Sequence, residues 1–145
     1  MPLVQSTEAV DKTAESLSKM TTATATSGAR AATGMAGPVK IGVIGCGRIG
    51  QVHMRALSTI AEARVTMCAD FFVKAAQSAA SKFGVPVAVQ DWKELVASPE
   101  VHGVIVCSPS DTHAEIIIAA ANAGKHIFCE KPIDYELGRI DEALA

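Results

Sequence analysis

Short apolar runs alternate with amphipathic segments along the chain from Val39 onward. The short runs are typical of buried β-strands, whereas apolar residues that recur every three or four positions predict helices. Strands are predicted at 39–45, 63–70, 85–89, 103–108 and 126–129. Helices are predicted at 47–60, 73–84, 91–98 and 112–124. This alternation predicts right-handed βαβ units and a doubly wound, parallel α/β domain over residues 39–145.

Residues with capping preferences mark several helix ends. Gly84 and Gly124 follow helical segments and are expected to stop them. Asp91 is expected to cap the short helix that it precedes. Thr112 and Glu115 have the spacing of a capping box. In the helix 47–60, the apolar residues with helical spacing are Ile49, Val52, Ala56 and Ile60.

A further helical pattern covers residues 135–145, with Leu137, Ile140 and Leu144 on one face. The pattern stops at Ala145 without a capping residue, and a sheet built from two halves would have a sixth strand. We therefore expect that the chain has been cut short or that its continuation is missing.

Residues 1–38 differ in composition from the rest, because the stretch 21–38 is almost entirely Ala, Thr, Ser and Gly. Such a segment has too few large apolar side chains to offset its ordering entropy, so we expect a disordered leader. The stretch contains Arg30 and no acidic residue, which is the composition of a transit peptide. Three acidic residues precede it, however, and the plain leader is therefore preferred.

Composition and charge exclude several classes of partner. Hydrophobic residues make up 49% of the chain and aromatic residues only 4%, so the core must consist of aliphatic side chains. A net charge of -2 with scattered Lys and Arg argues against nucleic acid and anionic membranes as partners. No apolar run approaches the ~20 residues that span a bilayer. We expect a cytoplasmic protein, with organelle targeting by residues 1–38 as the alternative.

The cysteines show no metal-site or disulfide-scaffold spacing, and we predict no metal site. All four lie near the ends of predicted strands, so they could share one edge of the sheet, but they are most simply small buried residues. They are Cys46, Cys68, Cys107 and Cys129.

A glycine motif follows the first predicted strand and opens the first helix. Gly45, Gly47 and Gly50 form G-x-G-x-x-G, which permits a tight turn, close approach of a pyrophosphate and close packing of the helix. Arg48 and Ile49 open the helix and complete the predicted cofactor-binding segment. A plain structural turn is the alternative reading, because three glycines alone are weak evidence.

Asp70 ends the second predicted strand, about 20 residues after the glycine motif, where an acid accepts hydrogen bonds from an adenosine ribose. Its charge would repel the 2'-phosphate of NADP, which favours NAD over NADP. Lys74 could reverse this preference by reaching back toward that phosphate. Phe71 and Phe72 either flank the adenine or simply pack at the start of the helix.

A polar turn follows the fourth strand, opposite the glycine motif at the expected switch point of the sheet. Ser108, Pro109 and Ser110 suit the nicotinamide half of a dinucleotide. His113 is expected in the first helical turn, facing either the cleft or solvent. Three other histidines have no evident partner in the sequence and are assigned no role: His53, His102 and His126.

Glu130, Lys131 and Pro132 follow the fifth strand at the same edge of the sheet. Because proline restricts the backbone, the Lys131 side chain would be aimed in one direction rather than free to sweep. A partly desolvated lysine beside a nicotinamide can orient a substrate hydroxyl and exchange a proton with it. The alternative is a solvated lysine at the end of a strand.

Together, these blocks resemble the N-terminal, Rossmann-like domain of the Gfo/Idh/MocA oxidoreductases, most closely the inositol 2-dehydrogenase branch. The resemblance rests on "IGVIGCGRIGQVH", Asp70, "CSPSDTHAEIIIAAANAGKHIFCEKPI" and "DYELGRIDEAL". It implies NAD(P)-dependent oxidation of a polyol or sugar hydroxyl to a ketone. It also implies that Lys131 is catalytic, that the peptide bond before Pro132 is often cis, and that Glu130 and His113 belong to the cofactor site.

The same resemblance implies a second, mostly β domain, which supplies further catalytic groups and through which homo-oligomers form. This chain ends before that domain, so an NAD-binding module without turnover, or an inactive truncated product, stays an alternative. A methyltransferase also uses a glycine loop and a strand-end acid. The dinucleotide spacing of the loop and the Glu-Lys-Pro segment disfavour that third reading.

Overall fold

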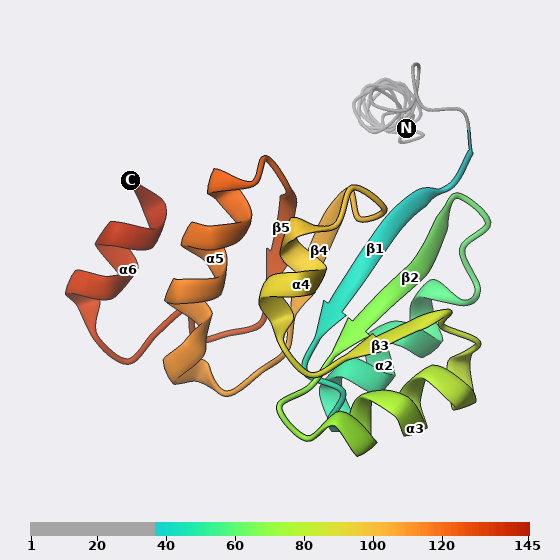
Figure 1. The fold of residues 1–145 in the computed structure, drawn as a ribbon. Coiled ribbons are helices and arrows are strands. Elements are labelled where there is room, and N and C mark those ends of the chain that lie inside the picture. Colours follow the sequence, from blue (N-terminus) through green and yellow to red (C-terminus); the bar gives the residue numbers. More distant parts are fainter. Residues whose placement is uncertain (1–36) are drawn as a thin grey trace, which may run out of the picture. The chain divides into compact units, whose positions relative to one another are not determined.

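A computed structural model describes residues 37–145, so the predictions for the leader lie almost wholly outside the described residues. The described part contains a five-stranded parallel sheet with the strand order β3-β2-β1-β4-β5 (Figure 1). The predicted doubly wound α/β class is confirmed, because the chain changes direction across the sheet between β1 and β4. The strands are β1 (Val39–Ile44), β2 (Ala63–Ala69), β3 (Val87–Val89), β4 (Gly103–Val106) and β5 (His126–Cys129).

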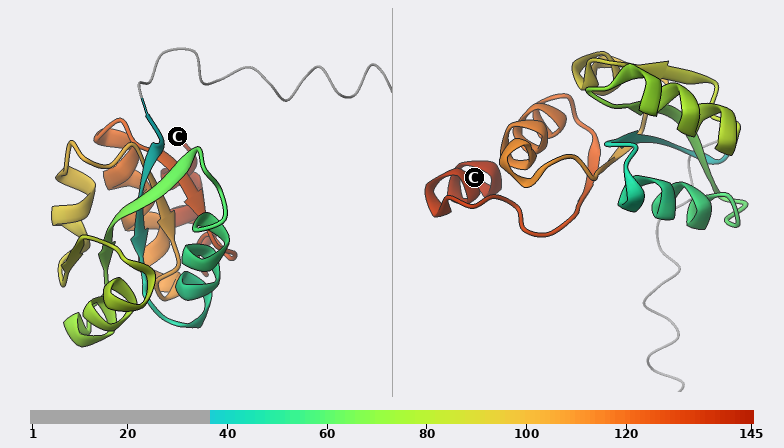
Figure 2. Two further views of the ribbon diagram at one scale, coloured as in Figure 1. Left: turned by 90° about the vertical axis from the view of Figure 1, so that its right-hand side faces the viewer. Right: turned by 90° about the horizontal axis from the view of Figure 1, so that it is seen from below.

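Helices connect the strands and cover both faces of the sheet (Figure 2). None of the helices in residues 37–145 is long and apolar enough to cross a membrane. The helices are α2 (Arg48–Leu57), α3 (Val73–Phe83), α4 (Trp92–Ala97), the 3-10 turn η1 (Ser110–Thr112), α5 (His113–Asn122) and α6 (Leu137–Leu144).

The strand register aligns the carboxyl ends of the five strands, and Val89 at the end of β3 lies opposite Ala69 of β2. Ile44 at the end of β1 lies opposite Ala69 of β2 and Val106 of β4. Val106 in turn lies opposite Cys129, the last residue of β5. The segments that follow these strands therefore begin at one edge of the sheet, although they are far apart in the sequence.

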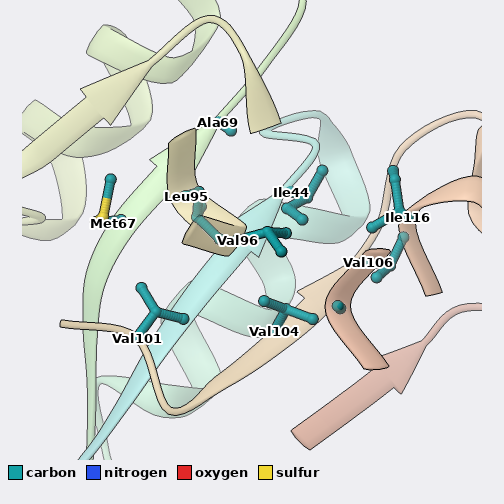
Figure 3. Packing of buried hydrophobic residues seen from close by; sticks show 10 residues of the cluster. Ile44, Met67, Ala69, Leu95, Val96, Val101, Val104, Val106 and Ile116 are labelled. Atoms are coloured by element: carbon teal, nitrogen blue, oxygen red, sulfur yellow. The ribbon is translucent and has the colours of Figure 1, made fainter. Parts of the chain in front are cut away.

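Alternate residues of the central strand enter two separate cores, as expected for a parallel sheet buried on both faces. Ile44 belongs to the core beneath α4 and α5, where it lies with Leu95, Val104 and Ile116 (Figure 3). Its neighbour Val43 belongs to the other core, beneath α2 and α3. The aliphatic character of both cores agrees with the low aromatic content.

The residues with helical spacing in the first predicted helix do not form its buried face. Ile49 and Val52 of α2 are exposed, and so is Ile60 beyond its end, whereas Gly50 and Met54 are buried. Gly50 allows the helix to approach the glycine loop closely, so the buried stripe follows this small residue instead of the larger aliphatic ones.

Most predicted helix ends are confirmed. Gly84 adopts a left-handed conformation with φ of 66° at the end of α3, and Gly124 does so just beyond α5. The Asp91 side chain accepts a hydrogen bond from the backbone N–H of Lys93 at the start of α4. The capping box at Thr112 is wrong, because this residue has helical dihedral angles and its hydroxyl donates to the Pro109 carbonyl instead.

The predicted last helix is present as α6, which lies alongside α5 at the end of the domain (Figure 2, right). Leu137 and Leu144 on its predicted apolar face are 78% and 68% exposed. The apolar face of α6 is therefore only partly covered by residues 37–145.

Replacement of Leu95 tests the core beneath α4. Leu95 is fully buried and packs directly above Gly42 of β1, where a Cβ atom would overlap with it. We expect Leu95→Ala to lower the free energy of unfolding by about 2–5 kcal/mol, since it leaves a cavity. Denaturant unfolding measures this loss, with Leu144→Ala on the exposed surface as the control. Equal effects of both substitutions would contradict the packing described.

Candidate functional site

A cleft of about 1010 Å³ opens at the edge where the carboxyl ends of the strands align. It lies at the switch point between β1 and β4, where open α/β sheets bind their ligands. Among the residues predicted for the site, those that line the cleft are Gly45, Gly47, Asp70, Ser108 and Pro109. The others, which do not line it, are Arg48, Ile49, Gly50, Ser110, His113, Glu130 and Lys131.

The three glycines of the loop meet different requirements. Gly45 has φ of 94°, and a Cβ atom there would lie 2.5 Å from the backbone of Cys107. A Cβ atom on Gly50 would collide with the carbonyl oxygen of Gly45. Around Gly47, in contrast, no atom lies within 4 Å of such a Cβ. Packing within the domain therefore explains Gly45 and Gly50, while the space at Gly47 is open to a ligand.

The N-terminus of α2 follows the glycine loop directly. No side chain caps it, and its first turn contains no acidic residue. The shorter helix α4 differs, because Asp91 caps it and Glu94 lies in its first turn. Unpaired N–H groups and the helix dipole at the N-terminus of α2 suit a phosphate group.

The Asp70 carboxylate is held at the base of the glycine loop. One of its oxygens accepts a 2.8 Å hydrogen bond from the backbone N–H of Cys46, and the other accepts one of 2.9 Å from Phe72. Each carboxylate oxygen has more than one acceptor site, so both can still accept hydroxyl groups from a ligand. The loop and the acid thus form one unit.

One wall of the cleft consists of Phe71, Phe72 and the start of α4. Of these, only the two phenylalanines were candidates from the sequence. Phe71 and Phe72 line the cleft, are 78% and 71% exposed and pack edge-to-face on each other, so they do not enter the core. The segment 90–94 also lines the cleft and was not predicted. No signal in the sequence marks it, because it reaches the cleft only through the pairing of β3 with β2.

His113 lies elsewhere than predicted. It is only 1% exposed, so it faces neither the cleft nor solvent. Its two ring nitrogens lie 2.8 Å from the carbonyl oxygens of Ser108 and Pro132. A neutral imidazole donates to one of these oxygens at a time, whereas an imidazolium donates to both. His113 therefore links the turn after β4 to the segment after β5.

The Glu130–Pro132 segment continues from β5 beside the cleft. The backbone N–H of Glu130 donates to the Val106 carbonyl, which extends the pairing of β5 with β4. The peptide bond between Lys131 and Pro132 is cis, as the resemblance implies. Lys131 is exposed, and its side chain forms no hydrogen bond or ion pair within residues 37–145.

His53, to which the sequence assigned no partner, contacts this segment. Its Nε2 atom lies 2.7 Å from Oε1 of Glu130, and its ring packs edge-on against Phe128. The hydrogen bond from His53 holds the pKa of the Glu130 carboxyl below its usual range. No sequence spacing could have indicated the pair, because its members are 77 residues apart.

The cysteines gather at the same edge but are poorly suited to thiolate chemistry. Cys46 and Cys68 are buried, whereas Cys107 and Cys129 are partly buried. Burial and the nearby Glu130 charge raise the pKa of Cys107 to about 12 and that of Cys129 to about 11. These two thiols therefore stay protonated at neutral pH.

Comparison with known proteins agrees with this geometry. A family model described as an oxidoreductase family with an NAD-binding Rossmann fold, GFO_IDH_MocA, matches residues 39–145. The chain belongs to this family. The chain spans about a third of the length of the curated relatives that it matches.

Three similar proteins illustrate the relationship. Inositol 2-dehydrogenase from Rhizobium meliloti is 44% identical over 106 residues, which cover 73% of this chain and 32% of that protein. Scyllo-inositol dehydrogenase from Lactobacillus casei, solved with NAD(H) and scyllo-inositol, has a TM-score of 0.69 and 32% identity, over 73% of this chain and 32% of that one. A 3-ketoreductase from Actinomadura kijaniata, solved with TDP-benzene and NADP, has a TM-score of 0.68 and 30% identity. This match covers 74% of this chain and 34% of that one.

The different roles of the glycines predict different effects on stability. Gly50→Ala should lower the free energy of unfolding by about 1–3 kcal/mol, because its Cβ collides with backbone that cannot move freely. Gly47→Ala should change it by no more than about 0.5 kcal/mol, as expected at an unpacked position. Denaturant titration of both variants provides the measurement. A large loss in Gly47→Ala would show that this glycine is also needed for folding.

Proposed function

We propose that this domain binds NAD and that, in the whole protein, it serves the oxidation of a polyol or sugar hydroxyl to a ketone, as in an inositol 2-dehydrogenase. The observation that carries the proposal is the shared edge of the sheet. This edge brings together an uncapped helix N-terminus, a fixed strand-end carboxylate and the Lys131 segment. The names of the relatives support the substrate class.

The residues at the cleft fit a dinucleotide. The open space at Gly47 and the free N–H groups of α2 would hold the pyrophosphate. Asp70 would accept hydrogen bonds from the adenosine ribose, with the exposed rings of Phe71 and Phe72 nearby. Ser108 and Pro109 line the part of the cleft that would receive the nicotinamide half.

Asp70 favours NAD over NADP within this proposal. Its carboxylate is fixed by two backbone N–H groups, so it cannot easily move away from a 2'-phosphate. Like charges at such close range repel each other strongly. Lys74 lies on the exposed side of α3 and is the cation that could offset this effect. Because the similar 3-ketoreductase was solved with NADP, the affinities of this chain for NAD and for NADP both have to be measured.

Lys131 is the proposed catalytic residue of the domain. Bound NAD supplies the acceptor for a hydride from the substrate carbon. In its neutral amine form, the Lys131 side chain would accept the proton of the reacting hydroxyl as the hydride leaves the substrate carbon, and the ammonium so formed would donate a hydrogen bond to the ketone oxygen. Its exposure leaves the Lys131 side chain free to meet a substrate.

A dinucleotide-binding module without turnover is the second candidate. It is favoured by the absence of any acidic or histidine partner of the Lys131 side chain within residues 37–145, since acid–base chemistry at a lysine commonly uses such a partner. Both candidates predict NAD binding. They differ only in the turnover of the full-length protein.

Substitution of Asp70 tests the cofactor assignment. Asp70→Ala should weaken NAD binding by about tenfold or more, because two charge-assisted hydrogen bonds to the ribose are lost. Asp70→Asn keeps the size and one acceptor oxygen but removes the charge, so it should narrow the preference for NAD over NADP. Calorimetric titration with both cofactors measures these effects, with Asp141→Asn on α6 as the control. Unchanged NAD affinity in Asp70→Ala would refute the assignment.

Substitution of Lys131 separates catalysis from binding. Lys131→Ala should leave the NAD affinity of this chain within about threefold of the original value, since the pyrophosphate and ribose contacts lie elsewhere. In the full-length protein, the same change should lower kcat by roughly 10²–10⁴ fold, as expected for the loss of a general acid–base group. Lys131→Arg is the matched control, because it keeps the charge but does not release a proton. Full turnover in Lys131→Ala would assign the proton transfer to another group, whereas no turnover in the original full-length protein would favour the second candidate.

A further inference from the structure

Both neighbours of Lys131 are held by histidine side chains. On one side, Oε1 of Glu130 lies 2.7 Å from Nε2 of His53. On the other side, the carbonyl oxygen of Pro132 lies 2.8 Å from Nδ1 of His113. Lys131 lies between these two contacts, and its own side chain forms no hydrogen bond or ion pair within residues 37–145.

The two histidines come from opposite faces of the sheet. His53 lies on α2, whose buried Met54 belongs to the core shared with α3. His113 begins α5, whose buried Ile116 belongs to the core shared with α4. The segment after β5 is therefore held by contacts from both faces of the sheet.

Each histidine also has a second contact that orients its ring. His113 lies 2.8 Å from the Ser108 carbonyl through Nε2, so its position depends on the turn that lines the cleft. The His53 ring packs edge-on against Phe128, with 5.3 Å between the ring centroids. Neither histidine lines the cleft, so neither is placed to contact a ligand there.

We propose that His53 and His113 are positioning residues that together fix the direction in which Lys131 enters the cofactor cleft. This inference rests on the proposed function, because that function supplies the cofactor and substrate toward which Lys131 would point. A lysine side chain has several rotatable bonds and explores many rotamers. Restraints on the backbone before and after it limit this freedom, and displacement of a catalytic group by about 1 Å can lower a rate about 10²-fold.

The hydrogen bond from His53 to Glu130 gives a second, local consequence. Because this bond lowers the pKa of the Glu130 carboxyl, the side chain next to Lys131 remains an anion over a wider pH range. Removal of His53 should therefore raise the pKa of Glu130 toward its ordinary value. Carboxyl chemical shifts followed through a pH titration report this change directly.

The test uses this chain with its lysines reductively methylated with ¹³C-formaldehyde, and the Lys131 signal is assigned with Lys131→Arg. NAD added to the original protein should shift the Lys131 signal, because the cofactor binds beside it. In His53→Ala and His113→Gln, the NAD dissociation constant should change by less than about threefold, while at least about half of the induced shift is lost. His126→Ala is the matched control and should keep the full shift, because His126 is exposed and lies at the start of β5, away from the segment that follows this strand.

The outcomes distinguish this inference from the proposed function. Failure of the original protein to bind NAD, or binding without any shift of the Lys131 signal, would overturn the proposed function. Binding with a full shift in both histidine variants would overturn the positioning role alone. His113→Gln removes a fully buried ring, so circular dichroism checks its folding. Should it unfold, His53→Ala decides the question through both the Lys131 shift and the Glu130 pKa.

Discussion

The parallel pairing of β1 with both β2 and β4 is the constraint on which the rest of the domain depends. This pairing places the ends of β1, β2, β4 and β5 in register, and it opens the switch point between β1 and β4. Every group proposed to meet the cofactor follows one of these strand ends. The site therefore exists because the sheet is parallel and its strands end together.

Close packing at the glycine loop then decides what the cleft can accept. Two of the glycines are required by contacts inside the domain, and the third faces open space. Asp70 connects this loop to the start of α3 through its two hydrogen bonds. The loop, the acid and the uncapped helix are thus held together before any ligand arrives, which would reduce the ordering cost of the proposed binding.

The segment after β5 is held in place in a different way from the glycine loop. Its position depends on side chains from α2 and α5, which lie on opposite faces of the sheet, and not on a loop motif of its own. A flexible lysine at the end of an edge strand would otherwise be poorly placed for chemistry. In our proposal, the two histidines give an exposed residue a defined direction.

The sequence alone determined the features that depend on neighbouring residues. Strand and helix alternation, the turn at Gly84, the cap at Asp91 and the glycine motif follow from local backbone preferences and periodicity, and all of them appear in the structure. The family resemblance rests on the same local blocks, and the match over residues 39–145 confirms it.

The tertiary structure decided which side chains are buried and which of them meet. The buried face of α2 depends on how closely Gly50 approaches the loop, and the burial of His113 depends on the segment that returns after β5. The pair of His53 and Glu130 joins residues 77 positions apart. Such contacts are set by the packing of whole elements against the sheet, and no local pattern in the chain encodes them.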